Sequence, residues 1–201
     1  MTTLLPIAYV MAGIGVVMYL LWHFLTNMKA FRPLTPIVGF MLVFVLTLCL
    51  QGFHWIEHIA QVMQAFVLDS RNAHGLLGQL DLEQVHFAFN TLYLGLVAHI
   101  TLQWFAHKEE FPSRWKLCAI ILIGTLLIQS YHQVEHTVKV FQFVQTMIQG
   151  TPGILGHFIN GVWFHFWMNA LVFWPLVFVY FYGGVHRRLM INLQRVQSEP
   201  A

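Results

Sequence analysis

Five long apolar runs, separated by short polar stretches, account for most of this sequence. They cover residues of about 5–27, 35–67, 81–106, 114–149 and 156–183. The hydrocarbon core of a bilayer is about 30 Å thick, and a helix needs roughly 20 residues to cross it. A backbone in lipid must satisfy its own hydrogen bonds, which favours helices. The sequence therefore predicts an all-α integral membrane protein with five transmembrane helices.

The composition supports this prediction. Of the 201 residues, 58% are hydrophobic and only 9% are charged, whereas soluble domains carry roughly 25% charged residues. The first run follows no Lys or Arg and is too long for the core of a signal peptide, so we expect it to be retained as a span. The basic residues form no interleaved stripe, so nucleic acid is not an expected partner. The expected partners are membrane lipid and other membrane subunits.

Basic residues gather on one side of the predicted membrane. Eight of the ten Lys and Arg residues lie near the segments that follow the first, third and fifth runs, and the remaining two are Arg71 and Lys139. By the positive-inside rule, the N-terminus is expected outside and the tail 184–201 in the cytoplasm, as in a bacterial inner membrane. The loops 68–80 and 150–155 would then face outward.

A sequence repeat runs through the second to fifth runs. The stretch QGFHWIEHIAQ, residues 51–61, returns 78 positions later as QSYHQVEHTVK. The units, about 35–106 and 114–183, each contain two predicted spans, so both copies have the same topology and a four-helix bundle from a tandem duplication is expected. Together with the first span they form a single membrane domain, 1–201. Gln51 and Gln129 are the first residues of the two matching stretches, and with one inserted residue His86 also matches His165 and Asn90 matches Asn169.

The repeated His-x-x-Glu-His motif is the strongest functional signal. Residues three and four apart share a helix face, so both histidines of a motif can bind one ion, with the glutamate as a ligand or proton acceptor. Ionisable groups at membrane depth are costly and usually face a bundle interior or a wet cavity. The candidate metal ligands are His54, Glu57, His58 and His86 in the first unit and His132, Glu135, His136 and His165 in the second.

This pattern resembles the geometry of four-helix di-metal proteins, in which two helices supply a Glu and His pair and two supply one ligand each. One or two transition-metal ions are therefore predicted. Imidazole with carboxylate suits Fe, Zn, Cu or Mn, and we favour Fe or Cu over Zn. Four amides, Gln51, Gln129, Asn90 and Asn169, are candidates for orienting the ligands or a cofactor. Hydrogen bonding between helices is an equally good explanation of these amides.

Four polar residues near the motifs are expected to face away from the metal site. Lys139 replaces Gln61 in the repeat, and we expect its side chain to extend outward, because a lysine beside bound cations is unfavourable. We expect His74, Asp81 and Glu83 to be solvated loop residues.

The function that fits these features best is a metal-dependent oxidoreductase acting on a lipid-soluble or small substrate, with Glu57 and Glu135 as catalytic groups. A non-catalytic subunit of a larger membrane complex, which binds haem or a pigment or only packs helices, is the main alternative. A metal transporter or sensor is less favoured, because the inner halves of the second and fourth runs are almost purely apolar. The motif also resembles the inverted zinc-peptidase signature, but nothing in the sequence suggests a domain to hold a peptide.

Overall fold

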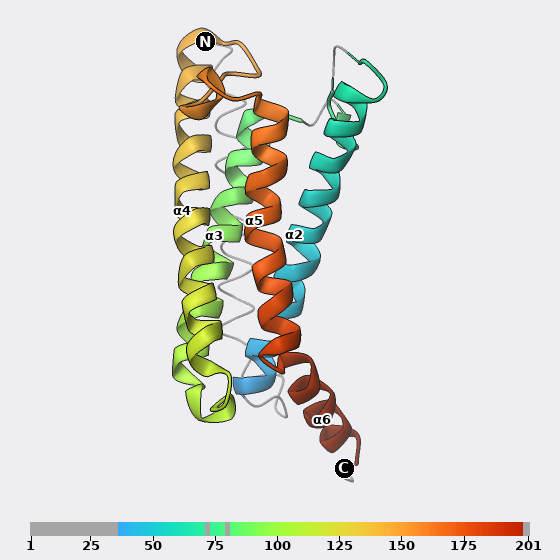
Figure 1. Cartoon of the computed structure of the whole chain (residues 1–201), viewed down its shortest axis with the longest axis vertical. Helices are drawn as coiled ribbons and strands as arrows, with labels where there is room; N and C mark the ends of the chain where they lie inside the picture. The colour runs from blue at the N-terminus through green and yellow to red at the C-terminus, as the bar shows by residue number, and fades with distance from the viewer. Residues whose placement is uncertain (1–35, 71–72, 79–80, 199–201) are drawn as a thin grey trace, which may run out of the picture.

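The computed structural model describes residues 36–70, 73–78 and 81–198, and these form helices and loops without a strand (Figure 1). The long helices are α2 (Pro36–Phe66), α3 (Glu83–Ala106), α4 (Trp115–Thr146) and α5 (Gly161–Tyr182), followed by the shorter α6 (Val185–Ser198). Single 3₁₀ turns occur at Lys108–Glu110 and Leu155–His157. The four long helices, α2 to α5, are long and apolar enough to cross a membrane. The prediction of an all-helical protein is therefore confirmed for the described residues, and four of the five predicted spans are helices of the length and composition that a membrane span needs. The run 5–27 lies outside the described residues.

Local backbone chemistry explains where two predicted spans were too long. The run 114–149 was expected to be helical, but α4 ends at Thr146, because Met147 adopts a left-handed conformation with φ of 58°. The run 156–183 was expected to begin earlier than α5 does. The side chain of Asn160 accepts hydrogen bonds from the backbone N–H groups of Val162 and Trp163 and so caps α5 at its start.

The four long helices lie side by side. Helix α2 packs against α3 and α5, and α4 likewise packs against α3 and α5. The loops that follow α2 and α4 lie at the same end of the helices, at the top of Figure 1, which we call the motif end. The loop between α3 and α4 lies at the opposite end with α6, which contacts α2 and α5.

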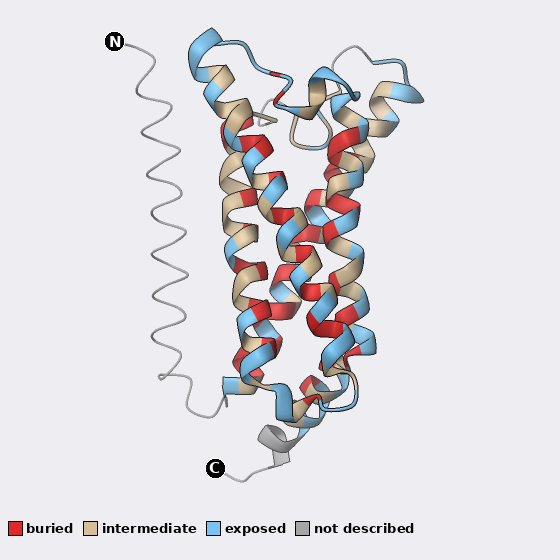
Figure 2. Ribbon diagram, turned by 60° about the vertical axis from the view of Figure 1, so that its left-hand side comes forward, coloured by how far each residue is buried: buried red, intermediate tan, exposed pale blue. Residues whose placement is uncertain are grey.

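The interior changes character along the helices. Buried residues lie on the faces that the helices turn toward one another (Figure 2). At the opposite end this interior is apolar and includes Phe44, Trp104, Leu122 and Leu176, each fully buried. Near the motif end most buried side chains are His, Gln, Asn and Glu. Most of the buried polar groups therefore lie in one half of the helix assembly, and large apolar side chains fill most of the other half.

We expect Leu122→Ala to lower the free energy of unfolding by about 2 kcal/mol, the low end for a buried leucine. Leu122 is fully buried, but lipid tails are as apolar as leucine, so mainly the packing contribution is lost. The matched control is Leu127→Ala, since Leu127 lies on the same helix with 66% of its surface exposed. Thermal unfolding of both variants in detergent measures the difference, and equal losses would contradict the described packing.

Candidate metal centre

Two groups of three buried histidines occur near the motif end in the described part of the chain. Within each group, one possible ligand nitrogen from every histidine lies within 4.8 Å of the others. Each of the six residues is at most 7% exposed, and each group combines two histidines of one helix with one histidine of the next. Triad A consists of His54 and His58 of α2 with His86 of α3, and triad B consists of His132 and His136 of α4 with His165 of α5.

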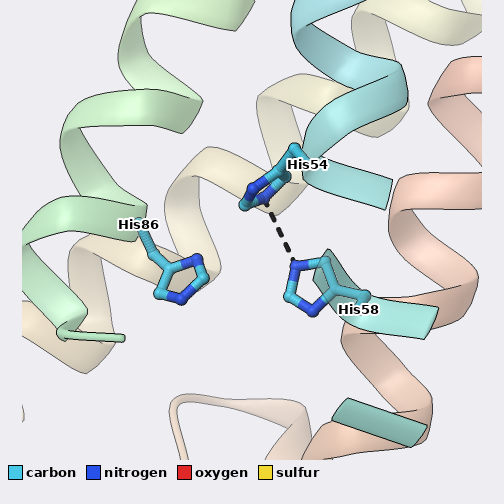
Figure 3. Close-up of side chains that lie close together, drawn as sticks. All are labelled: His54, His58 and His86. Carbon is cyan, nitrogen blue, oxygen red and sulfur yellow. Dashed lines mark hydrogen bonds between the residues drawn. The ribbon is translucent and has the colours of Figure 1, made fainter. Parts of the chain in front are cut away.

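In each triad, the two histidines that lie one turn apart bring their Nε2 atoms together. The separation is 3.3 Å between His54 and His58 (Figure 3) and 3.2 Å between His132 and His136. Two nitrogens bound to one tetrahedral ion at about 2.0–2.1 Å would lie about 3.3–3.4 Å apart. This spacing fits two nitrogens that bind one ion, and it also fits an N–H···N hydrogen bond between them. The ring nitrogens outside these two pairs distinguish a metal site from a hydrogen-bonded cluster.

Several other imidazole nitrogens are buried and have no hydrogen-bond partner among the described residues. Buried polar atoms are normally partnered, and leaving one without a partner costs about 1–3 kcal/mol. The atoms are Nδ1 of His86, His132 and His136 and Nε2 of His165. A bound ion would supply the missing partner of His86 Nδ1 in the first group and of His165 Nε2 in the second, whereas a cluster held only by mutual hydrogen bonds leaves both atoms without one. The Nδ1 atoms of His132 and His136 belong to rings that turn Nε2 toward each other, so they do not bear on the ion.

The two triads adjoin each other at the centre of the four helices. The ring centroids of His58 and His165 lie 5.8 Å apart, and those of His86 and His136 also lie 5.8 Å apart. The six imidazoles therefore form one continuous cluster that draws on all four long helices. Such a cluster can hold two neighbouring ions.

A polar cavity of about 580 Å³ joins this cluster to the motif end. Its lining extends from the exposed residues His74 and Asn160 to the buried residues His58 and His136. Ions, water and small polar molecules can therefore approach the histidines from the motif end.

The glutamates of the two motifs are buried, but their carboxylates contact loops and not the histidine triads. The carboxylate of Glu57 accepts hydrogen bonds from the backbone N–H groups of Leu76, at 2.8 Å, and Leu77, at 3.1 Å. Glu135 accepts equivalent bonds, at 2.8 and 3.1 Å, from the backbone of the loop that follows α4. These interactions fasten each loop to the helix before it, and they occupy the carboxylate of each glutamate with loop N–H groups.

A glycine and a glutamine complete each of these loop attachments. Gln64 exchanges two hydrogen bonds with the backbone of Gly75, at 2.7 and 3.0 Å, and Gln142 does the same with Gly153, at 2.8 and 3.0 Å. Both glycines have positive φ, 62° and 71°, a conformation that glycine adopts readily. A Cβ atom at either position would also meet the carboxylate of the glutamate in the same unit.

The four amides predicted near the site link neighbouring helices. Gln51 donates to the side chain of Asn169 at 2.8 Å, and Gln129 donates to that of Asn90 at 3.0 Å. Each asparagine in turn donates to the backbone carbonyl of the histidine one turn earlier in its own helix, at 2.9 and 2.8 Å. The amides therefore connect α2 with α5 and α4 with α3 just below the histidines.

Three charged residues take part in the site in ways that the sequence interpretation missed. Asp81 was expected to be solvated, but its Oδ1 lies 2.5 Å from Nε2 of His86. Glu83 is only 6% exposed, and its carboxylate lies 3.2 Å from Nζ of Lys139. The expectation that Lys139 extends outward was wrong, because its side chain is 13% exposed and lines the cavity. No sequence signal pointed to the contact of Asp81 with His86, because residues five apart do not share a helix face.

Asp81 lies outside the membrane-spanning helices, and its surroundings act on its pKa in opposite directions. Partial burial raises the pKa of this carboxyl group, whereas the hydrogen bonds and charges of His86 and His74 lower it, and the net pKa is below the ordinary value. Asp81 is therefore a carboxylate at neutral pH and can accept a hydrogen bond from His86.

No protein-family model, curated protein or solved structure matches the chain.

Proposed function

We propose that this integral membrane protein holds two transition-metal ions, one in each histidine triad, and uses them in oxidation–reduction chemistry on a small substrate. One observation carries the proposal: two buried histidine triads, with unpartnered ring nitrogens, adjoin each other beside a polar cavity. Ionisable groups at membrane depth are costly, and they are usually present because they have a function.

The number of ligands supports a reactive site. Three protein ligands leave a fourth coordination position for water or a substrate, as in catalytic metal sites. The cavity offers access to that position from the motif end. The apolar core at the opposite end, with Phe44 and Trp104 fully buried, supports access from one side and disfavours a transport path through the protein.

The ligand chemistry bears on the identity of the ions. Imidazole suits copper, iron and zinc, and among divalent ions of the first transition row copper binds nitrogen ligands most tightly. The triads contain no carboxylate to offset the charge of an ion, and the cost of burying an ion rises steeply with its charge. These arguments favour copper, which has a stable monovalent state, with iron as the second choice.

A subunit that binds haem or a pigment without catalysis is the second candidate. It is less well supported, because each pair of close nitrogens comes from a single helix. The nitrogens lie 3.3 Å apart in His54 and His58 of α2 and 3.2 Å apart in His132 and His136 of α4. The two axial ligands of a haem lie on opposite faces of the ring, so neither pair could hold a haem between its members. A zinc peptidase is disfavoured because Glu57 and Glu135, the expected bases, are bonded to loop amides.

We also infer that α2 to α5 come from a duplicated two-helix unit and that the motif end faces the extracytoplasmic side, with the N-terminus outside and the tail in the cytoplasm. The paired contacts of Glu57 and Glu135, of Gln64 and Gln142 and of the linking amides support the duplication. The distribution of Lys and Arg supports the orientation.

Redox spectroscopy tests the functional part of this proposal. The full-length protein in lipid nanodiscs is loaded with Cu²⁺, reduced with ascorbate and reoxidised with air, while its absorption and electron paramagnetic resonance spectra are recorded. We expect both ions to change oxidation state reversibly and to remain bound. Ions that stay bound but are never reduced would refute the redox function and leave the metal sites standing.

A further inference from the structure

The geometry points to two unequal metal sites: triad A binds its ion more tightly than triad B, and triad B exchanges its ion faster. Asp81 and Gln61 are the positioning residues that strengthen triad A, and Lys139 is the residue that weakens triad B. This inference rests on the proposed function only in requiring that both triads bind an ion.

The third histidine of each triad is oriented by a different kind of acceptor. In triad A, Nε2 of His86 lies 2.5 Å from the Asp81 carboxylate, which leaves Nδ1 to bind the ion. In triad B, Nδ1 of His165 lies 2.7 Å from the backbone carbonyl of Gly161, which leaves Nε2. A carboxylate makes the imidazole a more basic ligand than a neutral carbonyl does, so triad A has the stronger third ligand.

The second unit has an amide where the first has Asp81. In the repeat, with its one inserted residue, Asn160 stands at the position of Asp81. The side-chain oxygen of Asn160 accepts hydrogen bonds from the backbone of Val162, at 3.0 Å, and Trp163, at 3.3 Å. This residue is thus committed to capping α5.

The second histidine of each motif also differs in the hydrogen-bond partner of its Nδ1 atom. Nδ1 of His58 lies 2.7 Å from the side-chain oxygen of Gln61, which fixes the tautomer that presents Nε2 to the ion. Lys139 stands at the position of Gln61 in the second unit and pairs with Glu83. The corresponding atom, Nδ1 of His136, has no partner among the described residues.

Charge acts in the same direction. Lys139 follows His136 by three residues on the same helix, so the two side chains share a helix face and the ammonium group opposes a cation at triad B. Histidines of both triads line the cavity with Lys139, so the shared helix face is what makes triad B the more affected site. Glu83 offsets part of this charge. The carboxylate of Asp81 instead contacts a ligand of triad A. Triad A is therefore the site that binds its ion more tightly, and triad B is the site that exchanges its ion more readily.

Single-triad variants separate the two sites. His132→Ala disables triad B, and His54→Ala disables triad A. Each full-length variant in nanodiscs is stripped of metal and titrated with Co²⁺, with visible absorption reporting the coordination and dialysis reporting the stoichiometry. Hydrogen bonds to a ligand histidine, such as those of Asp81 and Gln61, change metal affinity about 10–100-fold. We therefore expect the Kd of triad A, measured in His132→Ala, to be at least about tenfold lower than the Kd of triad B, measured in His54→Ala.

Asp81 is then tested in each background. Asp81→Asn should raise the Kd by about 10–100-fold in the His132→Ala background and shift its Co²⁺ absorption, but change the Kd by less than about threefold in the His54→Ala background. Asp81→Glu should restore most of the affinity. The matched control is Asp69→Asn, which makes the same chemical change at an exposed residue. Independently, Lys139→Gln should tighten binding at triad B.

The outcomes distinguish this inference from the proposed function. Equal Kd values for the two triads, or an equal effect of Asp81→Asn on both, would overturn the inequality and leave two bound ions per chain. Absence of Co²⁺ binding by the metal-free wild-type protein would refute both the inequality and the proposed metal sites.

Discussion

A double variant carrying His54→Ala and His132→Ala is expected to lose both metal ions, while each single variant keeps one. Each substitution removes one of three ligand imidazoles from a buried triad. Loss of a residue that merely orients a ligand costs about 10–100-fold in affinity, and loss of the ligand itself should cost at least about 100-fold. Elemental analysis of the purified variants after gel filtration measures the change.

The matched control for this experiment is His99→Ala. His99 lies on α3 outside both triads and is partly exposed, so its removal should leave the metal content unchanged. If the double variant retains both ions, His54 and His132 are not ligands and the triads have been assigned incorrectly.

The second large effect concerns stability. Glu57→Ala is expected to lower the free energy of unfolding by about 3 kcal/mol, because two loop N–H groups lose hydrogen bonds to a charged acceptor. Those groups belong to Leu76 and Leu77. The folded fraction should still bind metal at both triads, since the carboxylate contacts the loop. Thermal unfolding and metal analysis of the same preparation give both quantities. A variant of unchanged stability that has lost one ion would instead establish Glu57 as a ligand.

Glycine substitutions test the same loop attachment from the other side. Gly75→Ala would place a Cβ atom against the Glu57 carboxylate, whereas Gly78→Ala would place one in open space. Both glycines have similar positive φ, 62° and 57°, so the backbone penalty of about 1 kcal/mol is common to both. Gly75→Ala should therefore be the more destabilising of the two, and equal effects would contradict the described contact.

The sequence contains enough to predict the histidine pairs but not their full surroundings. His54 and His58 share a face because they are four residues apart, and their recurrence as His132 and His136 distinguishes both pairs from the other histidines of the chain. These relations lie within one helix, where spacing determines geometry.

Contacts between separate segments could not be predicted in this way. Lys139 was expected to extend outward, yet it meets Glu83 of another helix, and Asp81 was assigned to solvent although it contacts His86. The carboxylate of Glu57 accepts hydrogen bonds from a loop about 20 residues further on. The path of that loop includes the positive φ of Gly75. The same reasoning explains the misplaced ends of two spans, which were fixed by Met147 and Asn160 and not by hydrophobicity.

Elemental analysis combined with an optical spectrum of the wild-type protein, supplied with excess copper or iron and freed of unbound metal, tests the central claim most directly. Two buried histidine triads should retain about two ions per chain when three imidazoles bind each ion, and the spectrum should lack the Soret band of haem. A folded wild-type protein that retains no transition metal, or one that carries haem in place of the ions, would contradict the account.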